Sequence, residues 1–165
     1  MPQVPAFAIL KEKFPNQGDV GAIADLVGGM VQKNLKDEKY TDYKNTCAIR
    51  VSHALNLGGD PIDKGGGKLT NKYAKDKKIR TDDGTKGHYI YSVYDLEQYL
   101  TGRFGAPKPF DKSTTQAQLA KANIKGIILF AYWHADLWDG TTCLYHNAGF
   151  GQSKVQQILI YPSAG

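Results

Sequence analysis

The spacing of apolar residues divides the chain into a helical first part and a strand-rich last part. Near the N-terminus, apolar residues at positions 7, 9, 10 and 14 predict a short helix that stops at Pro15. From Val20 to Val31 apolar residues recur at three- and four-residue intervals, which predicts a second helix with Gly28 and Gly29 in its middle. The polar segment 33–44 predicts an exposed connection.

A third helix is predicted to begin at Cys47. Thr46 is a suitable N-cap, the segment 48–55 supplies an apolar stripe, and Gly58-Gly59 is a typical helix end. The segment 60–87 is rich in Gly, Lys and Asp, which predicts an exposed loop. After it, a short aromatic strand from His88 leads into a helix over 94–104, and a further helix is expected over 114–123.

The last part of the chain changes to a strand pattern. Residues 125–150 are apolar, β-branched and aromatic, and Asp139-Gly140 predicts a hairpin turn within them. Residues 154–162 predict a final strand that stops at Pro162. Helices first and antiparallel strands last indicate an α+β fold, and 165 residues suit one domain over 1–165.

Composition narrows the class of protein. The chain has no apolar run of about 18 residues and no secretory signal pattern, so we expect synthesis in the cytoplasm and no membrane insertion. Two cysteines exclude a disulfide scaffold, no Cys/His spacing suggests zinc, and no nucleotide-binding motif occurs. No metal or organic cofactor is therefore expected. The net charge of +5 is compatible with an anionic partner, either nucleic acid or an acidic cell-wall polymer.

Cys47 is the first candidate for chemistry. The reactive form of cysteine is the thiolate, and the unpaired N–H groups of a first helical turn favour negative charge and lower the thiol pKa. The predicted position of Cys47 therefore suits a nucleophile. A buried, inert cysteine is the alternative, because free cysteine is among the most buried residue types.

A cysteine nucleophile needs a base, and the chain has four histidines. His53 falls about 240° around the helix from Cys47, since each helical residue turns about 100°. His88 opens a strand after a loop, and His146 lies near the end of the predicted hairpin. His134 lies within the apolar segment "LFAYWHADLW", where a polar side chain is unusual and suggests a specific role. A hydrogen-bonded core histidine is the alternative there.

Several blocks of the chain resemble one family. The segments "NTCAIRVSHALN", "YIYSVYDLEQYLTGRFGAP" and "WHADLWDGTTC", together with the earlier "FPNQ" and "VGGMVQKN", are similar in order and spacing to the fourth family of bacterial type VI secretion amidase effectors. The resemblance covers nearly the whole chain. It implies a papain-like cysteine hydrolase fold, with Cys47 at the position of the nucleophile and His134 at that of the general base.

The resemblance also implies a function and partners. Members of this family are peptidoglycan amidases that cut the stem peptide between γ-D-glutamate and meso-diaminopimelate. They are delivered by the type VI secretion machinery, act in the periplasm of the target cell, and are neutralised by a cognate immunity protein. The expected partners are therefore peptidoglycan, the secretion machinery and an immunity protein, and no nucleic acid.

The residue that orients the histidine departs from the family pattern. That pattern places an aspartate two residues after the hairpin cysteine, and here Tyr145 follows Cys143 at this spacing. A two-residue turn at Asp139-Gly140 would place His134 opposite Tyr145, with Asn147 diagonally adjacent on the same face. Because an amide can orient an imidazole, the predicted catalytic set is Cys47, His134 and Asn147.

Other residues stay open as the orienting group. A bulge in the hairpin would bring His146 across from His134. Asp136 shares the face of His134, but would have to bend back along its own strand to reach the ring. Arg50 has two possible roles, as a ligand for a carboxylate of the stem peptide or as one half of an ion pair on the helix surface.

Two other functions are compatible with the same residues. A transpeptidase or an amidase that acts on protein glutamine would keep the cysteine and histidine but change the acceptor or the substrate. A non-catalytic module would instead bind nucleic acid or wall polymer through the basic loop at 64–80, and the departure at Tyr145 gives this alternative some support.

Overall fold

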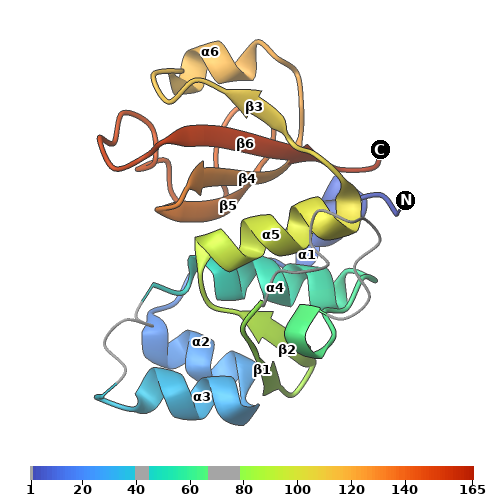
Figure 1. Ribbon diagram of the computed structural model, residues 1–165, viewed down its shortest axis with the longest axis vertical. Coiled ribbons are helices and arrows are strands. Elements are labelled where there is room, and N and C mark those ends of the chain that lie inside the picture. The colour runs from blue at the N-terminus through green and yellow to red at the C-terminus, as the bar shows by residue number, and fades with distance from the viewer. Residues whose placement is uncertain (1, 40–44, 67–78) are drawn as a thin grey trace.

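The computed structural model describes residues 2–39, 45–66 and 79–165. A four-stranded sheet with one short helix forms one end of the molecule, and two helices with a small hairpin form the other (Figure 1). The helices α4 (Cys47–Leu57) and α5 (Val93–Phe104) lie between these ends. The order of helices and antiparallel strands confirms the predicted α+β class.

The first helices follow the predicted pattern with one break. Helix α1 (Phe7–Lys13) ends before Pro15 as predicted, but the second predicted helix is two, α2 (Val20–Val27) and α3 (Gly29–Lys36). Gly28 separates them with a φ of 71°, a conformation that favours glycine. A side chain at Gly29 would lie 2.5 Å from the carbonyl oxygen of Asp83, so the glycine pair lets this corner close against the hairpin.

The segment predicted as an exposed loop contains a strand. Strand β1 (Thr81–Gly84) pairs antiparallel with β2 (Gly87–Ile90), and a single 3-10 turn, η2, covers Lys64–Gly66. The residues "TDDG" of β1 have low strand propensity, which is why the sequence pattern missed it. Residues 67–78, the middle of the predicted loop, lie outside the described residues.

The larger sheet has the strand order β3-β6-β4-β5, and every pair is antiparallel. Its strands are β3 (Lys108–Phe110), β4 (Gly126–Ala131), β5 (His134–Trp138) and β6 (Gln157–Pro162), and α6 (Gln116–Ala120) lies between β3 and β4 in sequence. The apolar segment that contains His134 is therefore not one strand. It turns at residues 132 and 133, so that Phe130 pairs with His134 and the histidine begins a strand.

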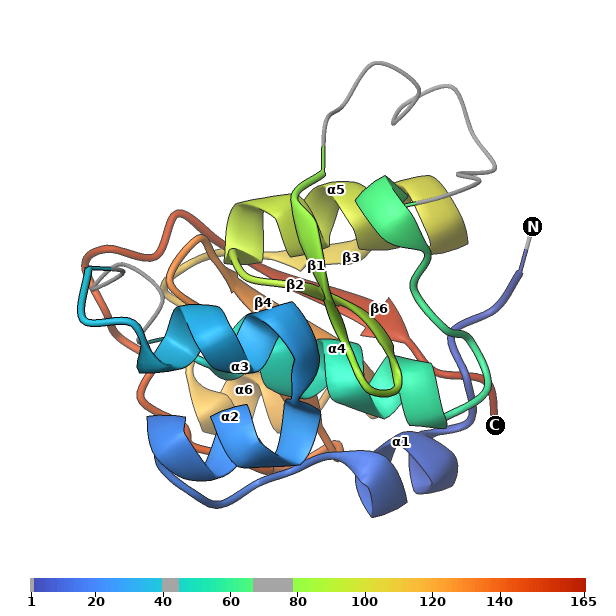
Figure 2. The same ribbon diagram turned by 90° about the horizontal axis from the view of Figure 1, so that it is seen from below.

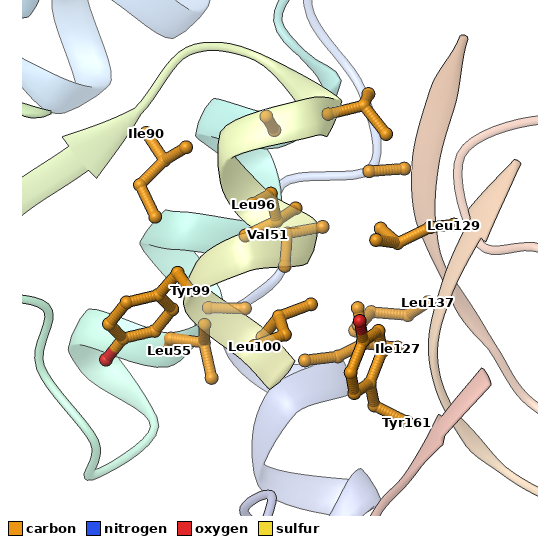
Figure 3. Close-up of a cluster of buried hydrophobic side chains, with 14 of the residues drawn as sticks. Val51, Leu55, Ile90, Leu96, Tyr99, Leu100, Ile127, Leu129, Leu137 and Tyr161 are labelled. Carbon is orange, nitrogen blue, oxygen red and sulfur yellow. The ribbon is translucent and has the colours of Figure 1, made fainter. Parts of the chain in front are cut away.

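The core joins the sheet to the central helices. Figure 3 shows Val51 of α4 and Leu96 and Leu100 of α5 facing Leu129 and Leu137 of the sheet, and all five are buried. Helix α4 also contacts α1 and β2, so it is enclosed by the sheet on one side and the hairpin end on the other (Figure 2). No helix in the described ranges is long and apolar enough to cross a membrane.

Candidate active site

Cys47 is the first residue of α4, as predicted. Its backbone N–H donates to Oδ1 of Asn45 at 3.1 Å, so Asn45 supplies the side-chain bond at this helix start. Thr46 occupies the N-cap position but its side chain makes no capping bond. The Thr46 hydroxyl instead accepts from Nε of Arg50 at 3.0 Å, which corrects the predicted cap.

The Cys47 thiol lies in the core beside β5, with only 1% of the residue exposed. Burial raises its pKa to about 11, although backbone hydrogen bonds from Ala135 and Ala48 oppose the shift. The predicted lowering of the thiol pKa is therefore wrong in net direction. The Ala48 amide of the first turn acts as expected, but desolvation outweighs it, and the resting cysteine is a protonated thiol.

His134 begins β5 and is buried, with Nε2 2.8 Å from Oδ2 of Asp136. Its chain neighbour Ala135 is the residue whose backbone contacts the Cys47 thiol. The sheet and α4 thus bring Cys47 and His134 to one place in the fold, 87 positions apart in the sequence numbering. Because Nε2 is engaged by the carboxylate, Nδ1 is the ring nitrogen that remains for exchange of a proton with another group.

Asp136 is fully buried, and its carboxylate is held from several sides. Oδ1 accepts from the N–H groups of Leu137 at 2.8 Å and Tyr145 at 2.9 Å, and Oδ2 accepts from the N–H of His146 at 3.0 Å and bonds with His134. The aspartate does reach back along its own strand to the ring, which sequence reasoning had counted against it. A buried carboxylate with this many donors suits the role of orienting an imidazole.

Asn147 lies in the loop that follows Cys143, and its side chain bonds to residues 142 and 143. Its Oδ1 accepts from the N–H of Cys143 at 2.8 Å and its Nδ2 donates to the hydroxyl of Thr142 at 2.7 Å. Within the described ranges it makes no hydrogen bond to His134, so the predicted contact is replaced by that of Asp136.

The turn before Asn147 explains this difference. Trp138 pairs with Cys143 rather than with residue 141, so the turn is two residues longer than predicted. The Asp139 carboxylate accepts from the N–H groups of Thr141 and Thr142 at 2.8 Å each and stabilises this wider turn. Beyond Cys143, the N–H of Leu144 still donates to the carbonyl of Leu137 at 2.9 Å, and the N–H groups of Tyr145 and His146 then donate to Asp136 instead of continuing the ladder.

His146 is the residue that sequence reasoning placed near the site only through a bulge. Its ring stacks on His134, with centroids 3.9 Å apart and 19° between the planes. The Nδ1 of His146 accepts from the N–H of Ala148 at 3.2 Å, and burial, followed by the proximity of His134, lowers its pKa. A neutral His146 therefore covers one face of the candidate base.

The other histidines lie apart from this site. His53 Nδ1 is 2.7 Å from the hydroxyl of Tyr89, which confirms that His53 faces away from Cys47. His88 lies in β2 and its Nδ1 is 3.5 Å from the hydroxyl of Thr81. Both cysteines are free thiols, and within the described part of the chain no three His, Cys, Asp or Glu side chains are placed to hold a metal ion.

The arrangement resembles that of papain-like cysteine hydrolases, in which a helix-start cysteine meets a strand histidine that a third polar residue orients. One protein-family model, described as type VI secretion system amidase effector protein 4 (Tae4), matches residues 43–161. The chain therefore belongs to the Tae4 family of type VI secretion amidase effectors. No curated protein matches it.

Solved structures of the same family have the same fold. The Tae4 effector from Enterobacter cloacae is 28% identical, with a TM-score of 0.76 and coverage of 100% of both chains. The Salmonella Typhimurium Tae4 in complex with Tai4 is 25% identical, with a TM-score of 0.75 and coverage of 97% of this chain and 99% of that one. The Enterobacter cloacae Tae4 in its Tae4-Tai4 complex is 26% identical, with a TM-score of 0.73 and the same coverages.

Proposed function

We propose that this amidase effector is a cysteine hydrolase that cleaves the peptidoglycan stem peptide between γ-D-glutamate and meso-diaminopimelate. The observation that carries the proposal is the arrangement of Cys47 beside β5, with His134 bonded to the buried Asp136. Membership of the amidase family supports the reaction class. The specific bond comes from the resemblance of the sequence blocks.

The proposed first step is transfer of the Cys47 proton to Nδ1 of His134, followed by attack of the sulfur on the γ-D-glutamyl carbonyl carbon. Asp136 accepts the N–H of Nε2, which keeps Nδ1 free to take the proton and stabilises the imidazolium that forms. Because burial raises the pKa of the Cys47 thiol, we propose that the thiolate forms through this proton transfer and is not already present in the free protein.

The second part of the reaction regenerates the thiol. The tetrahedral adduct collapses, the C–N bond breaks, and the imidazolium of His134 gives its proton to the departing amine of diaminopimelate. Water then attacks the thioester with His134 as base, which releases the glutamate carboxylate and returns the proton to sulfur. The third residue in this proposal is Asp136, in place of Asn147.

The test is cleavage of purified muropeptides, with products identified by mass spectrometry. Cys47→Ala and His134→Ala are expected to abolish cleavage while circular dichroism stays that of the wild type. Cys143→Ala is the matched control, because Cys143 is also buried and, among the hydrogen bonds of the described residues, its side chain makes none to His134 or Asp136. Full cleavage by either site variant would refute cysteine catalysis.

The product masses also separate the alternatives. A transpeptidase leaves a new amide bond and a larger product, whereas an amidase acting on protein glutamine leaves muropeptides intact. A wild-type protein that binds wall polymer without cleaving it would favour the binding module.

We further propose that an immunity protein of the Tai4 type inhibits this chain, because two of the similar solved structures are complexes with Tai4. By the same family argument we propose delivery by the type VI secretion machinery and action in the periplasm of the target cell. Expression with an export signal is then expected to lyse bacteria, and expression without one is not. Cys47→Ala should remove the lysis.

A further inference from the structure

Arg50 is a buried cation near the candidate site. It lies on α4, three residues after Cys47, and only 1% of it is exposed. The guanidinium carbon is 4.0 Å from the centroid of the Tyr145 ring. The remaining partners of its nitrogens are neutral oxygens, namely the hydroxyl of Thr46 and the carbonyls of Pro15, Gln17 and Gly18.

This environment contradicts both roles predicted for Arg50. A buried side chain that uses four of its five N–H groups on internal acceptors does not form a surface ion pair, and it is not placed to bind a carboxylate of a substrate through its planar fork. Among the described residues, no carboxylate forms a salt bridge with it. The Asp136 carboxylate interacts with Arg50 electrostatically, but without a direct ion pair. A buried charge without a direct ion-pair partner costs free energy, so we look for a role that a neutral side chain would not fill.

The Tyr145 ring connects Arg50 to the carboxylate of the site. A guanidinium over an aromatic face is held by the ring quadrupole, and the attraction strengthens when water is excluded. The backbone N–H of the same tyrosine donates to Oδ1 of Asp136 at 2.9 Å, and the next N–H, of His146, donates to Oδ2 at 3.0 Å. The contact with Arg50 therefore holds residues 145 and 146 in place, and the N–H groups of these two residues hold the carboxylate of Asp136.

We propose that Arg50 is a positioning residue for the amidase reaction, acting through its stack on Tyr145 to hold Asp136 against Nε2 of His134. This inference rests on the proposed function. It gives Tyr145 a role as well, since its ring is the surface on which the guanidinium lies. Arg50 touches neither the substrate nor the reacting atoms in this account, so its loss should affect the rate of the chemical steps rather than substrate binding.

The test compares kcat and KM on a soluble stem-peptide fragment for four variants. Arg50→Met removes the cation and Tyr145→Leu removes the ring. Each is expected to lower kcat by about 10- to 100-fold with KM within about threefold of wild type, as for a misplaced catalytic group. Tyr145→Phe keeps the ring and is expected to retain the wild-type kcat. Arg50→Lys keeps the charge without the planar fork and should lie between Arg50→Met and wild type.

A double variant tests whether the two residues act as one unit. If Arg50 works through Tyr145, then Arg50→Met combined with Tyr145→Leu should lose no more kcat than the worse single variant. Arg80→Met is the matched control, because the guanidinium of Arg80 also lies over a tyrosine, 5.1 Å from the Tyr91 centroid, away from the site. It should leave kcat and KM unchanged.

Two outcomes would overturn the positioning role. One is a folded Arg50→Met or Tyr145→Leu protein with the wild-type kcat, and the other is a double variant whose losses multiply. If Arg50→Met does not fold, Tyr145→Leu decides the question, because Tyr145 is only partly buried. A wild-type protein that cleaves no stem peptide would refute the proposed function instead, so the two failures are distinguishable.

Discussion

At the scale of single residues, Asp136 is the most constrained group of the candidate site. Three backbone N–H groups and the His134 ring occupy its two oxygens, and none of the carboxylate is exposed to water. These bonds fix the direction of the carboxylate without the help of solvent. It can therefore keep the proton of His134 on Nε2, which leaves Nδ1 as the acceptor.

Asp136→Asn tests this role with almost no change of shape. The neutral amide of asparagine has no negative charge to stabilise the imidazolium, and its NH2 group would face a backbone N–H that needs an acceptor. We therefore expect kcat to fall by about 10²- to 10⁴-fold. Asn147→Ala should keep kcat within about threefold and lower the free energy of unfolding by about 1 kcal/mol, because it loses two loop hydrogen bonds. Steady-state kinetics and urea denaturation measure both. The reverse ranking of the two variants would reinstate Asn147.

The buried thiol of Cys47 predicts a dependence of stability on alkaline pH. Burial raises its pKa to about 11 in the folded protein, from the ordinary value of 9.0 in the unfolded chain. The folded state keeps the proton between these values and the unfolded state loses it, so stability falls as pH rises through this range, by about 1.4 kcal/mol per pH unit.

The measurement is the difference in free energy of unfolding between wild type and Cys47→Ala, in reducing buffer, from pH 8 to pH 10.5. Subtracting the variant removes the contribution of Cys143, whose pKa burial also raises. The stability of the wild type relative to the variant should be constant below pH 9 and fall above it. A difference that does not change with pH would mean that the thiol is not desolvated.

At the scale of elements, the start of α4 is tied to the turn between β4 and β5. Asn45 accepts from the N–H of Cys47 through Oδ1 and donates from Nδ2 to the carbonyl of Trp133 at 3.3 Å. One amide side chain thus joins the helix end that carries the thiol to the turn that precedes His134. In the proposed reaction, the relative placement of these two elements sets the distance over which the proton moves from Cys47 to His134.

Asn45→Ala is therefore expected to lower kcat by about tenfold, because it frees the helix start from the turn. Loss of the cap should cost about 1 kcal/mol of stability. Thr115→Ala is the control, because Thr115 caps α6 by the same kind of bond on the far side of the sheet. Thr115→Ala should lower the free energy of unfolding by a similar amount and leave kcat unchanged. Equal loss of kcat in both variants would assign the effect to stability alone.

At the scale of the whole molecule, one core holds the two ends together. Apolar residues of α4 and α5 and of β4, β5 and β6 form a single buried cluster, as Figure 3 shows. The site lies where α4 meets β5, so it exists only when the helical end and the sheet are packed together. The single domain over 1–165 stays a prediction, which an unfolding experiment tests.

Unfolding in urea should accordingly be one cooperative transition. Trp138 lies in β5 and Trp133 in the turn between β4 and β5, so their fluorescence reports the sheet end of the molecule, while far-UV circular dichroism also reports the helices. The two signals should change together, and Leu137→Ala should shift both midpoints equally, by about 2–5 kcal/mol of unfolding free energy. Separate transitions would show two independently folding parts.

The sequence predicted those elements that depend on residues close together in the chain, and missed those that depend on contacts between distant segments. The helix that starts at Cys47, the helix ending at Phe104 and the last strand were predicted, because each depends on local spacing and on Gly or Pro at its ends. The break at Gly28 and the strand β1 were not predicted. Both depend on a close approach between segments that are distant in sequence.

For the site, the sequence by itself determined the candidates for the chemistry: a cysteine at a helix start and a histidine in the strand region, within blocks that resemble one family. Only the tertiary structure decided that Asp136 contacts the histidine, that Arg50 is buried on Tyr145, and that the thiol pKa is raised. Residue type and local periodicity are properties of a short segment. Burial, turn width and the partners of a buried charge depend on how distant segments pack, and no short segment contains that information.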